Sequence, residues 1–217
     1  MAPPWHPCDG RDRARLVGVS ARLVPDDLLD DESFVDEDLS GEDASGARWL
    51  DVTLTGCTLD ELVLDSADLA ACRITRSHAT ALHARDGGWR DTVWEGSRLG
   101  ALTAHGSRWD RVTLRGCRLG FVNLRDARLE AVRLEGCQVD DLDLAGAQTS
   151  RLTLVDCRVR RLDLNRASLA GADLTGLDVA ALERLDGVAG LRGATLAHDG
   201  LLTLAPLLAE HLGIRLA

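Results

Sequence analysis

The chain has 217 residues, of which 45% are hydrophobic, 28% are charged and 3% are aromatic, and its formal net charge is -10. This length allows one domain with a sizeable core, built mainly from Leu, Val and Ala. No stretch approaches the roughly 18 consecutive apolar residues of a membrane helix, and the N-terminus lacks the apolar segment of a signal peptide. We therefore expect a cytoplasmic protein.

Residues 1–31 are expected to form a partly disordered N-terminal tail and cap. Ten acidic residues and no Arg lie between Asp26 and Asp43, whereas the rest of the chain holds 25 acids and 25 Arg. The whole net charge is thus concentrated in one short segment. This segment supplies nine candidate interaction residues: Asp26, Asp27, Asp30, Asp31, Asp36, Glu37, Asp38, Glu42 and Asp43.

A five-residue repeat runs without insertion from Ala47 to Ala181, giving 27 units. In each unit the first residue is small or apolar. The third is apolar in every unit except at Thr149, and neither position carries a charge. All 18 Arg and 19 acids of this stretch occupy the other three positions. Two inward and three outward residues per unit fit neither a helix nor a simple strand alternation, but they fit a chain that turns a corner every five residues.

Four such units would close one square coil of 20 residues, and residues 20 apart would then stack on one wall. The first residues of the units sort in this way. One wall has small polar residues and thiols, a second has Leu and Val, and a third has mostly Ala. The members of the first wall are Cys57, Ser77, Ser97, Cys117, Cys137 and Cys157. The sorting supports the square coil independently of the five-residue pattern.

Upstream, Phe34, Leu39 and Ala44 continue the repeat, and we place the start of the coils at residue 32. Their small partners are replaced by Glu32, Glu37 and Glu42. An unpaired carboxylate facing a core costs several kcal/mol. We therefore expect this first coil to be open, splayed or facing solvent.

The units ARWLD, VTLTG and CTLDE resemble the repeat of the pentapeptide-repeat proteins over residues 47–181. The resemblance implies an all-β fold, a right-handed quadrilateral β-helix. Because nothing interrupts the repeat, the chain is similar to the members without loops. The best-described activity of that family is protection of DNA gyrase and topoisomerase IV from poisons by a rod that mimics DNA, a form of antibiotic resistance or self-resistance.

Residues 182–217 are expected to form a C-terminal cap with a short helix over Leu201–Leu212, in which Pro206 is tolerated if the helix begins near it. Leu201, Leu204, Leu208 and Leu212 fall on one face of this helix. The face either covers the last coil or forms a dimer contact, since gyrase-protecting members of the family dimerise through C-terminal elements.

Two clusters invite a chemical interpretation. The stacked Cys, with Cys72 on a neighbouring wall, are interpreted as buried packing residues because there is no CxxC pair and no His at ligand spacing. Trp49, Trp89, Trp94 and Trp109 occupy inward positions near Ala79, Ala84 and Ala104, which favours mutual filling of volume. The alternative is an aromatic pocket formed by Trp89, Trp94, Trp109, His78, His83 and His105.

No nucleophile elbow, phosphate loop, metalloprotease motif or pair of catalytic carboxylates is present, so we predict no enzyme activity, cofactor, metal or catalytic residue. Arg158, Arg160 and Arg161 face Asp140 and Asp141 on one wall and are interpreted as charge ladders. The preferred function is a non-enzymatic binding or scaffold protein acting through protein contacts, without direct nucleic-acid or membrane binding. The alternatives are the gyrase-protecting DNA mimic and an enzyme with an aromatic pocket. The balanced charge of the repeat weakens the DNA mimic.

Overall fold

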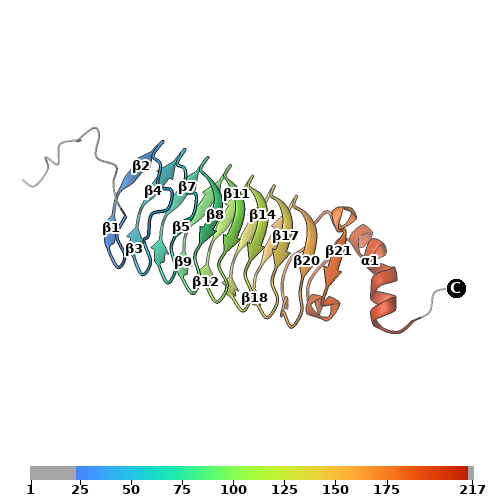
Figure 1. The fold of residues 1–217 in the computed structure, drawn as a ribbon. Coiled ribbons are helices and arrows are strands. Elements are labelled where there is room, and N and C mark those ends of the chain that lie inside the picture. Colours follow the sequence, from blue (N-terminus) through green and yellow to red (C-terminus); the bar gives the residue numbers. More distant parts are fainter. Residues whose placement is uncertain (1–22, 215–217) are drawn as a thin grey trace, which may run out of the picture.

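The structure is a computed structural model that describes residues 23–214. It is a parallel β-solenoid of about eight turns that ends in one helix, as predicted. Figure 1 shows the coils stacked along one axis, with the helix α1 at the C-terminal end. In the described part of the chain, no helix is long and apolar enough to cross a membrane.

The strands form three seven-stranded parallel sheets. Sheet 1 contains β1 Leu28–Asp30, β3 Arg48–Leu50, β6 Asp68–Ala70, β9 Gly88–Arg90, β12 Arg108–Asp110, β15 Arg128–Glu130 and β18 Gln148–Ser150. Sheet 2 contains β2 Ser33–Val35, β4 Thr53–Thr55, β7 Arg73–Thr75, β10 Val93–Glu95, β13 Thr113–Arg115, β16 Arg133–Glu135 and β19 Thr153–Val155. Sheet 3 contains β5 Leu62–Val63, β8 His78–His83, β11 Arg98–Thr103, β14 Arg118–Asn123, β17 Gln138–Asp143, β20 Arg158–Asp163 and β21 Arg184–Asp186.

The register between strands confirms the 20-residue coil. Trp49 pairs with Leu69 in sheet 1, Leu54 pairs with Ile74 in sheet 2, and Leu62 pairs with Leu82 in sheet 3. Each inward residue therefore stacks on its counterpart one coil away. The wall of small polar residues and thiols is equally regular. The Cys57 amide donates to the Ser77 hydroxyl at 3.1 Å, and that hydroxyl donates to the Thr75 carbonyl at 3.2 Å. The hydroxyls of this wall are thus satisfied inside the core.

Most corners of the coil place one residue in the left-handed region of φ. Gly fills some of these corners, and Asp is frequent among the others, for example Asp51 (φ 53°), Asp86 (φ 57°) and Asp126 (φ 56°). Asp tolerates this conformation better than most residues with a side chain. The six-residue strands of sheet 3 differ, because they continue through a corner at Ala81, Ala101 and Phe121 without a positive φ. One corner of the solenoid is therefore extended, and it carries the groove described below.

The first coil is closed, contrary to our expectation. Phe34, Leu39 and Ala44 are buried, and β2 pairs in register with β4. Strands also begin earlier than the predicted residue 32, because β1 starts at Leu28. Glu32 is exposed, and Glu37 and Glu42 are half-buried. These carboxylates belong to the terminal coil and keep contact with water, so closing the coil does not require burying a charge.

The C-terminal end departs from the repeat after Asp178. The 3-10 helix η1 (Val179–Ala181) lengthens the coil, and β21 pairs with β20 so that Arg161 lies opposite Arg184. A second 3-10 helix, η2 (Val188–Leu191), precedes α1 (His198–His211). The helix begins three residues before the predicted Leu201, so Pro206 lies in its interior and not near its start. Pro206 lacks an N–H and cannot donate to the carbonyl one turn earlier, yet the helix continues through it.

Candidate protein-interaction surfaces

The candidate acidic residues lie together on the first coil, within residues 26–43. Seven are exposed, and Glu37 and Glu42 are half-buried. Asp38 accepts hydrogen bonds from the Ser40 hydroxyl at 2.5 Å and the Ser40 amide at 3.0 Å, and Asp43 is bound in the same way by Ser45. These hydrogen bonds hold the pKa values of both carboxyls below their ordinary values. Both groups are therefore charged at neutral pH.

The acidic residues of the first coil have no cationic partner in the described structure. Every ion pair between residues 23 and 214 involves an acid outside the segment 26–43. The first coil thus presents carboxylates that are not neutralised within the described part of the chain.

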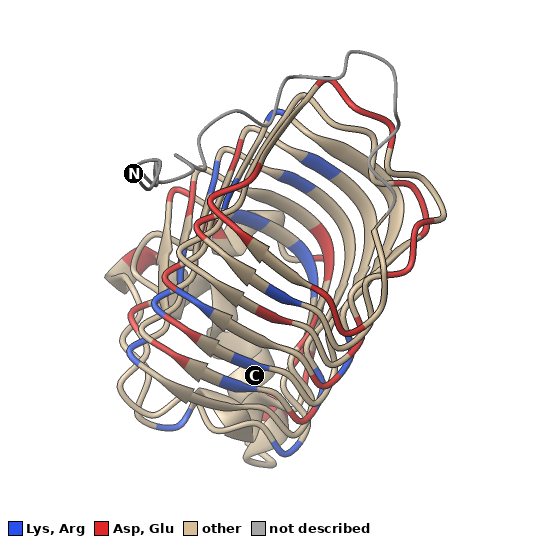
Figure 2. Ribbon diagram, turned by 90° about the vertical axis from the view of Figure 1, so that its left-hand side faces the viewer, with Lys and Arg blue, Asp and Glu red and all other residues tan. Residues whose placement is uncertain are grey.

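The body of the solenoid, residues 47–181, carries ladders of opposite charge instead. Arg161 Nε lies 3.0 Å from Asp141, and Arg160 bridges Asp140 at 3.5 Å and Glu183 at 3.0 Å. This confirms the ladder interpretation of that wall. Figure 2 shows basic and acidic segments alternating along the walls. Each exposed pair contributes little to stability, but together they cancel the charge of the body.

The C-terminal helix divides the four predicted leucines between two environments. Leu204 is buried and Leu208 half-buried against the last coil, whereas Leu201 and Leu212 are 46% and 72% exposed. Ala209 joins the buried side. Helix α1 contacts η1, and its buried residues are Leu204 and Ala209, so the middle of the predicted row is covered while its two ends stay exposed.

The Trp and His residues of the predicted aromatic pocket are not brought together. Trp89 stacks on Trp109 with ring centroids 4.7 Å apart, and on Trp94 at 5.8 Å, all inside the coil. His78, His83 and His105 are at outward positions; His78 is exposed and the other two are half-buried. Around the described residues, the pocket lined by His78 does not include Trp89, and the pocket lined by Trp89 does not include His78. The rings serve as core.

Five cysteines are buried and free: Cys57, Cys72, Cys117, Cys137 and Cys157. Burial raises the pKa of the Cys57 and Cys72 thiols. Their hydrogen bonds run to backbone carbonyls, such as Cys72 Sγ to Trp49 O at 3.6 Å. The thiols therefore act as small packing residues, and among the described residues no group of His, Cys, Asp or Glu is arranged to hold a metal ion.

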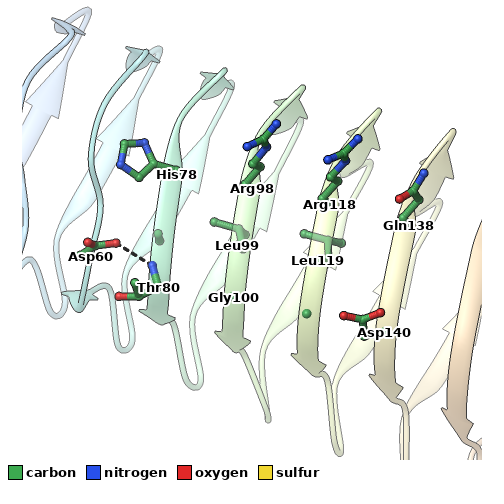
Figure 3. A pocket seen from close by; sticks show the side chains of 12 residues that line it. Asp60, His78, Thr80, Arg98, Leu99, Gly100, Arg118, Leu119, Gln138 and Asp140 are labelled. Carbon is green, nitrogen blue, oxygen red and sulfur yellow. Dashed lines mark hydrogen bonds between the residues drawn. The ribbon is translucent and has the colours of Figure 1, made fainter.

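The structure adds one feature that the sequence analysis missed, a shallow groove of about 390 Å³ along the extended corner of sheet 3. Figure 3 shows His78, Arg98, Arg118 and Gln138 in a row along one side of it. The groove is also lined by Thr80, Gly100, Gly120, Asp60 and Asp140. Comparing outward residues 20 apart would have shown that Arg98 and Arg118 have no acid at that spacing, but it would not have shown the groove.

Among known proteins, this chain is similar to solved structures of low sequence identity. No family model matches the sequence, and no curated protein matches it. A trypsin-treated variant of QnrB1, described as a plasmid-mediated fluoroquinolone resistance protein, is 19% identical, covering 92% of this chain and 95% of its own, with a TM-score of 0.42. HetL, a pentapeptide repeat protein involved in heterocyst differentiation regulation from the cyanobacterium Nostoc sp. strain PCC 7120, is 21% identical, covering 82% and 92%, with a TM-score of 0.27. Because the sequence identities and TM-scores are this low, the function is argued only from the geometry of this chain.

Proposed function

We propose that this chain, which has the fold of the pentapeptide-repeat proteins, is a non-enzymatic protein that binds a basic protein partner through its acidic first coil. The observation that carries the proposal is the acidic segment 26–43, which forms no ion pair within residues 23–214, beside a body that carries ladders of ion pairs. A partner with a cationic surface would gain attraction at this end of the rod and little along its walls. Electrostatic complementarity of this kind raises the association rate and selects the partner.

The rigid scaffold favours binding over catalysis. The outward residues are held at fixed spacing by the ladder, so the acidic surface is already organised before a partner arrives. The body supplies a rigid spacer, and the first coil supplies the charge.

The experiment compares three proteins by affinity capture followed by titration of the purified partner. The first is the wild type. The second carries Asp26→Asn, Asp31→Asn and Asp36→Asn, and the third carries Asp51→Asn, Asp86→Asn and Asp126→Asn. All six are exposed corner residues with positive φ, and none is in an ion pair of the described structure, so the triple variants are matched. Only the first-coil variant should lose the partner, by about tenfold or more in affinity, with binding weakened by salt. Equal loss in both variants contradicts the proposal.

A gyrase-protecting DNA mimic is the second candidate, and it is supported by the same acidic coil. A mimic that fills a DNA-binding groove needs negative charge along its length, but the body has 19 acids and 18 Arg. We therefore place this candidate second. Purified gyrase with a topoisomerase poison tests it directly. Poison-stabilised DNA cleavage that is unchanged by added protein removes this candidate and leaves the broader binding proposal standing.

A further inference from the structure

Two arginines on sheet 3 stand out from the charge ladders of the body. Arg98 and Arg118 are exposed and lie opposite each other in the register of β11 and β14. In the described part of the chain, neither makes an ion pair or a side-chain hydrogen bond, whereas nearby Arg158 and Arg161 each pair with an acid 20 residues away. Like charges placed directly opposite each other on neighbouring strands are destabilising. The two guanidinium groups therefore form a cationic site without an internal counter-ion.

The surrounding residues explain why these arginines have no partner. One coil before Arg98 lies His78, and one coil after Arg118 lies Gln138, so neither neighbour in the row is acidic. Across each strand, the position two residues on is Gly100 or Gly120. One coil before Gly100 this position holds Thr80, and the acids at this position, Asp60 one coil further back and Asp140 one coil after Gly120, face the ends of the groove. The acids are thus removed from the centre of the groove and kept only at its ends.

The floor of the groove cannot be filled by a side chain in the present backbone. A Cβ at Gly100 would lie 2.5 Å from the Thr80 carbonyl oxygen, and one at Gly120 would lie 2.3 Å from the Gly100 carbonyl oxygen. The ladder pairs Leu99 with Leu119 and Ala101 with Phe121, and it leaves these two glycines unpaired. The guanidinium groups therefore border an open space formed by main chain.

An acid already binds the floor at one end. The Asp60 carboxylate accepts a hydrogen bond of 2.6 Å from the Thr80 amide, as drawn in Figure 3. This contact demonstrates that a main-chain amide along this corner can point outward and meet an anion. Thr80 lies one coil from Gly100 and two coils from Gly120, on the same line of residues.

We propose that the row His78, Arg98, Arg118 and Gln138 is a binding site for a phosphate monoester. A phosphate monoester carries about 1.5 to 2 negative charges at neutral pH and three acceptor oxygens. One such group can neutralise both guanidinium groups, whereas a single carboxylate would leave one positive charge uncompensated. Guanidinium groups bind phosphate through paired hydrogen bonds. The neighbouring imidazole and amide add further donors, and the groove volume of about 390 Å³ suits a small phosphorylated molecule.

The test is calorimetric titration of the full chain with glycerol 2-phosphate, with glycerol as the uncharged control and inorganic phosphate as a second probe. We expect saturable binding of glycerol 2-phosphate and none of glycerol. Arg98→Gln and Arg118→Gln should each weaken binding by about tenfold or more, and the double variant should lose it. Both residues are exposed, so unchanged circular dichroism and melting temperature will verify that the variants are folded.

The matched control is the pair Arg108→Gln with Arg128→Gln. These two arginines also face each other in register, on sheet 1, and neither is in an ion pair of the described structure. However, Asp110 and Glu130 lie two residues further along these strands, at the positions that Gly100 and Gly120 occupy in sheet 3. They pair with Arg111 and Arg151, so carboxylates stand where the groove of sheet 3 is open. The control should bind within about twofold of the wild type. Equal weakening by the control, or no saturable binding by the wild type at millimolar ligand, would overturn the proposal.

The second probe identifies what the site recognises. Tighter binding of glycerol 2-phosphate than of inorganic phosphate would assign the site to esters, and equal binding would assign it to the phosphate group alone; both support the site. The first-coil variant Asp26→Asn, Asp31→Asn and Asp36→Asn should bind the ligand as the wild type does. If no phosphate monoester binds, the proposed role of the acidic first coil is therefore unaffected. If the first coil binds no partner, the phosphate site is likewise unaffected.

Discussion

The first coil and the body of the solenoid share one backbone but differ in their outer chemistry. Inside, Phe34 and Leu39 of the first coil are as buried as Leu54 and Leu59 of the next. Outside, the first coil has ten acids and no Arg over residues 26–43, whereas the body has 19 acids and 18 Arg. The difference shows that two positions in five determine the fold, and the other three are free to carry function.

Truncating a large inward side chain gives the largest expected loss of stability. Doing so once in the body and once in the first coil compares the cores of the two regions. Trp89→Ala should lower the free energy of unfolding by about 3–5 kcal/mol, because its ring stacks on Trp94 and Trp109 in mid-body. Phe34→Ala should cost less, because its strand β2 pairs only with β4 and the terminal coil can unfold by itself. Urea unfolding of both variants measures this. Equal costs would mean that the first coil unfolds together with the body.

The C-terminal helix extends the comparison to the other end of the rod. Leu204→Ala should lower the free energy of unfolding by about 2–4 kcal/mol, since this leucine is buried against the last coil. Leu212→Ala is the matched control. Because the Leu212 side chain is 72% exposed, this substitution should leave the free energy of unfolding unchanged. Thermal unfolding distinguishes the two, and equal effects would contradict the cap.

The dimer contact remains a prediction, and it would be made by the exposed side of the same helix. Leu202 and Leu212 are 60% and 72% exposed, and Ile214 is 55% exposed beside them. Leu202→Glu with Leu212→Glu should convert a wild-type dimer to a monomer in sedimentation velocity while the melting temperature holds. A wild type that sediments as a monomer contradicts the contact and leaves the cap as the helix's role.

Most of the fold could be predicted because inward residues obey a strict spacing. Uncharged first and third positions imply the five-residue turn, and the sorted walls imply the coil of 20 residues. The errors lie where the repeat ends. Glu32, Glu37 and Glu42 were read as facing a core, but a terminal coil has no neighbour on one side and its carboxylates stay hydrated. Helix α1 crosses Pro206 because packing of Leu204 and Ala209 outweighs the lost hydrogen bond.

The surfaces were less predictable than the core. The acidic segment is visible in sequence because its residues are neighbours in the chain. The groove of Arg98 and Arg118 is not, because it depends on residues 20 apart at outward positions and on a corner that lacks the usual positive φ. Gly100 and Gly120 would be read as flexible residues in sequence, whereas in the fold they are required by the close approach of neighbouring main chains.

The ion pair of the half-buried Asp65 with the exposed Arg85, in the body, gives a smaller effect that depends on pH. The Asp65 carboxylate accepts hydrogen bonds from the Arg85 amide at 2.8 Å and from Arg85 Nε at 2.9 Å. Burial alone would raise the pKa of Asp65, but these hydrogen bonds and the positive charge of Arg85 outweigh it and leave the pKa below its ordinary value. A carboxyl with a lowered folded-state pKa stabilises the fold above its unfolded pKa of about 3.9, and this contribution is lost as the pH falls through the folded value.

Asp65→Asn should therefore lower the free energy of unfolding by about 1 kcal/mol at pH 7, and the difference from wild type should shrink as the pH falls below about 4. Asp126→Asn is the control, because Asp126 is exposed and is in no ion pair of the described structure. Urea unfolding as a function of pH measures both. A difference for Asp65→Asn that persists unchanged into acid would show that the carboxylate charge is not the cause.

Neutralising the first coil gives the smallest effect, and its sign is reversed. Asp26→Asn, Asp31→Asn and Asp36→Asn should raise the melting temperature by about 1–2 °C, because they relieve repulsion among carboxylates that form no ion pair in the part of the chain that the structure describes. Salt should stabilise the wild type and stabilise this variant less, since screening acts on the same repulsion. The corner variant Asp51→Asn, Asp86→Asn and Asp126→Asn should keep the wild-type salt response. If both triple variants respond to salt alike, the first coil is not electrostatically distinct from the body. That result would contradict the proposal that the acidic surface binds a partner.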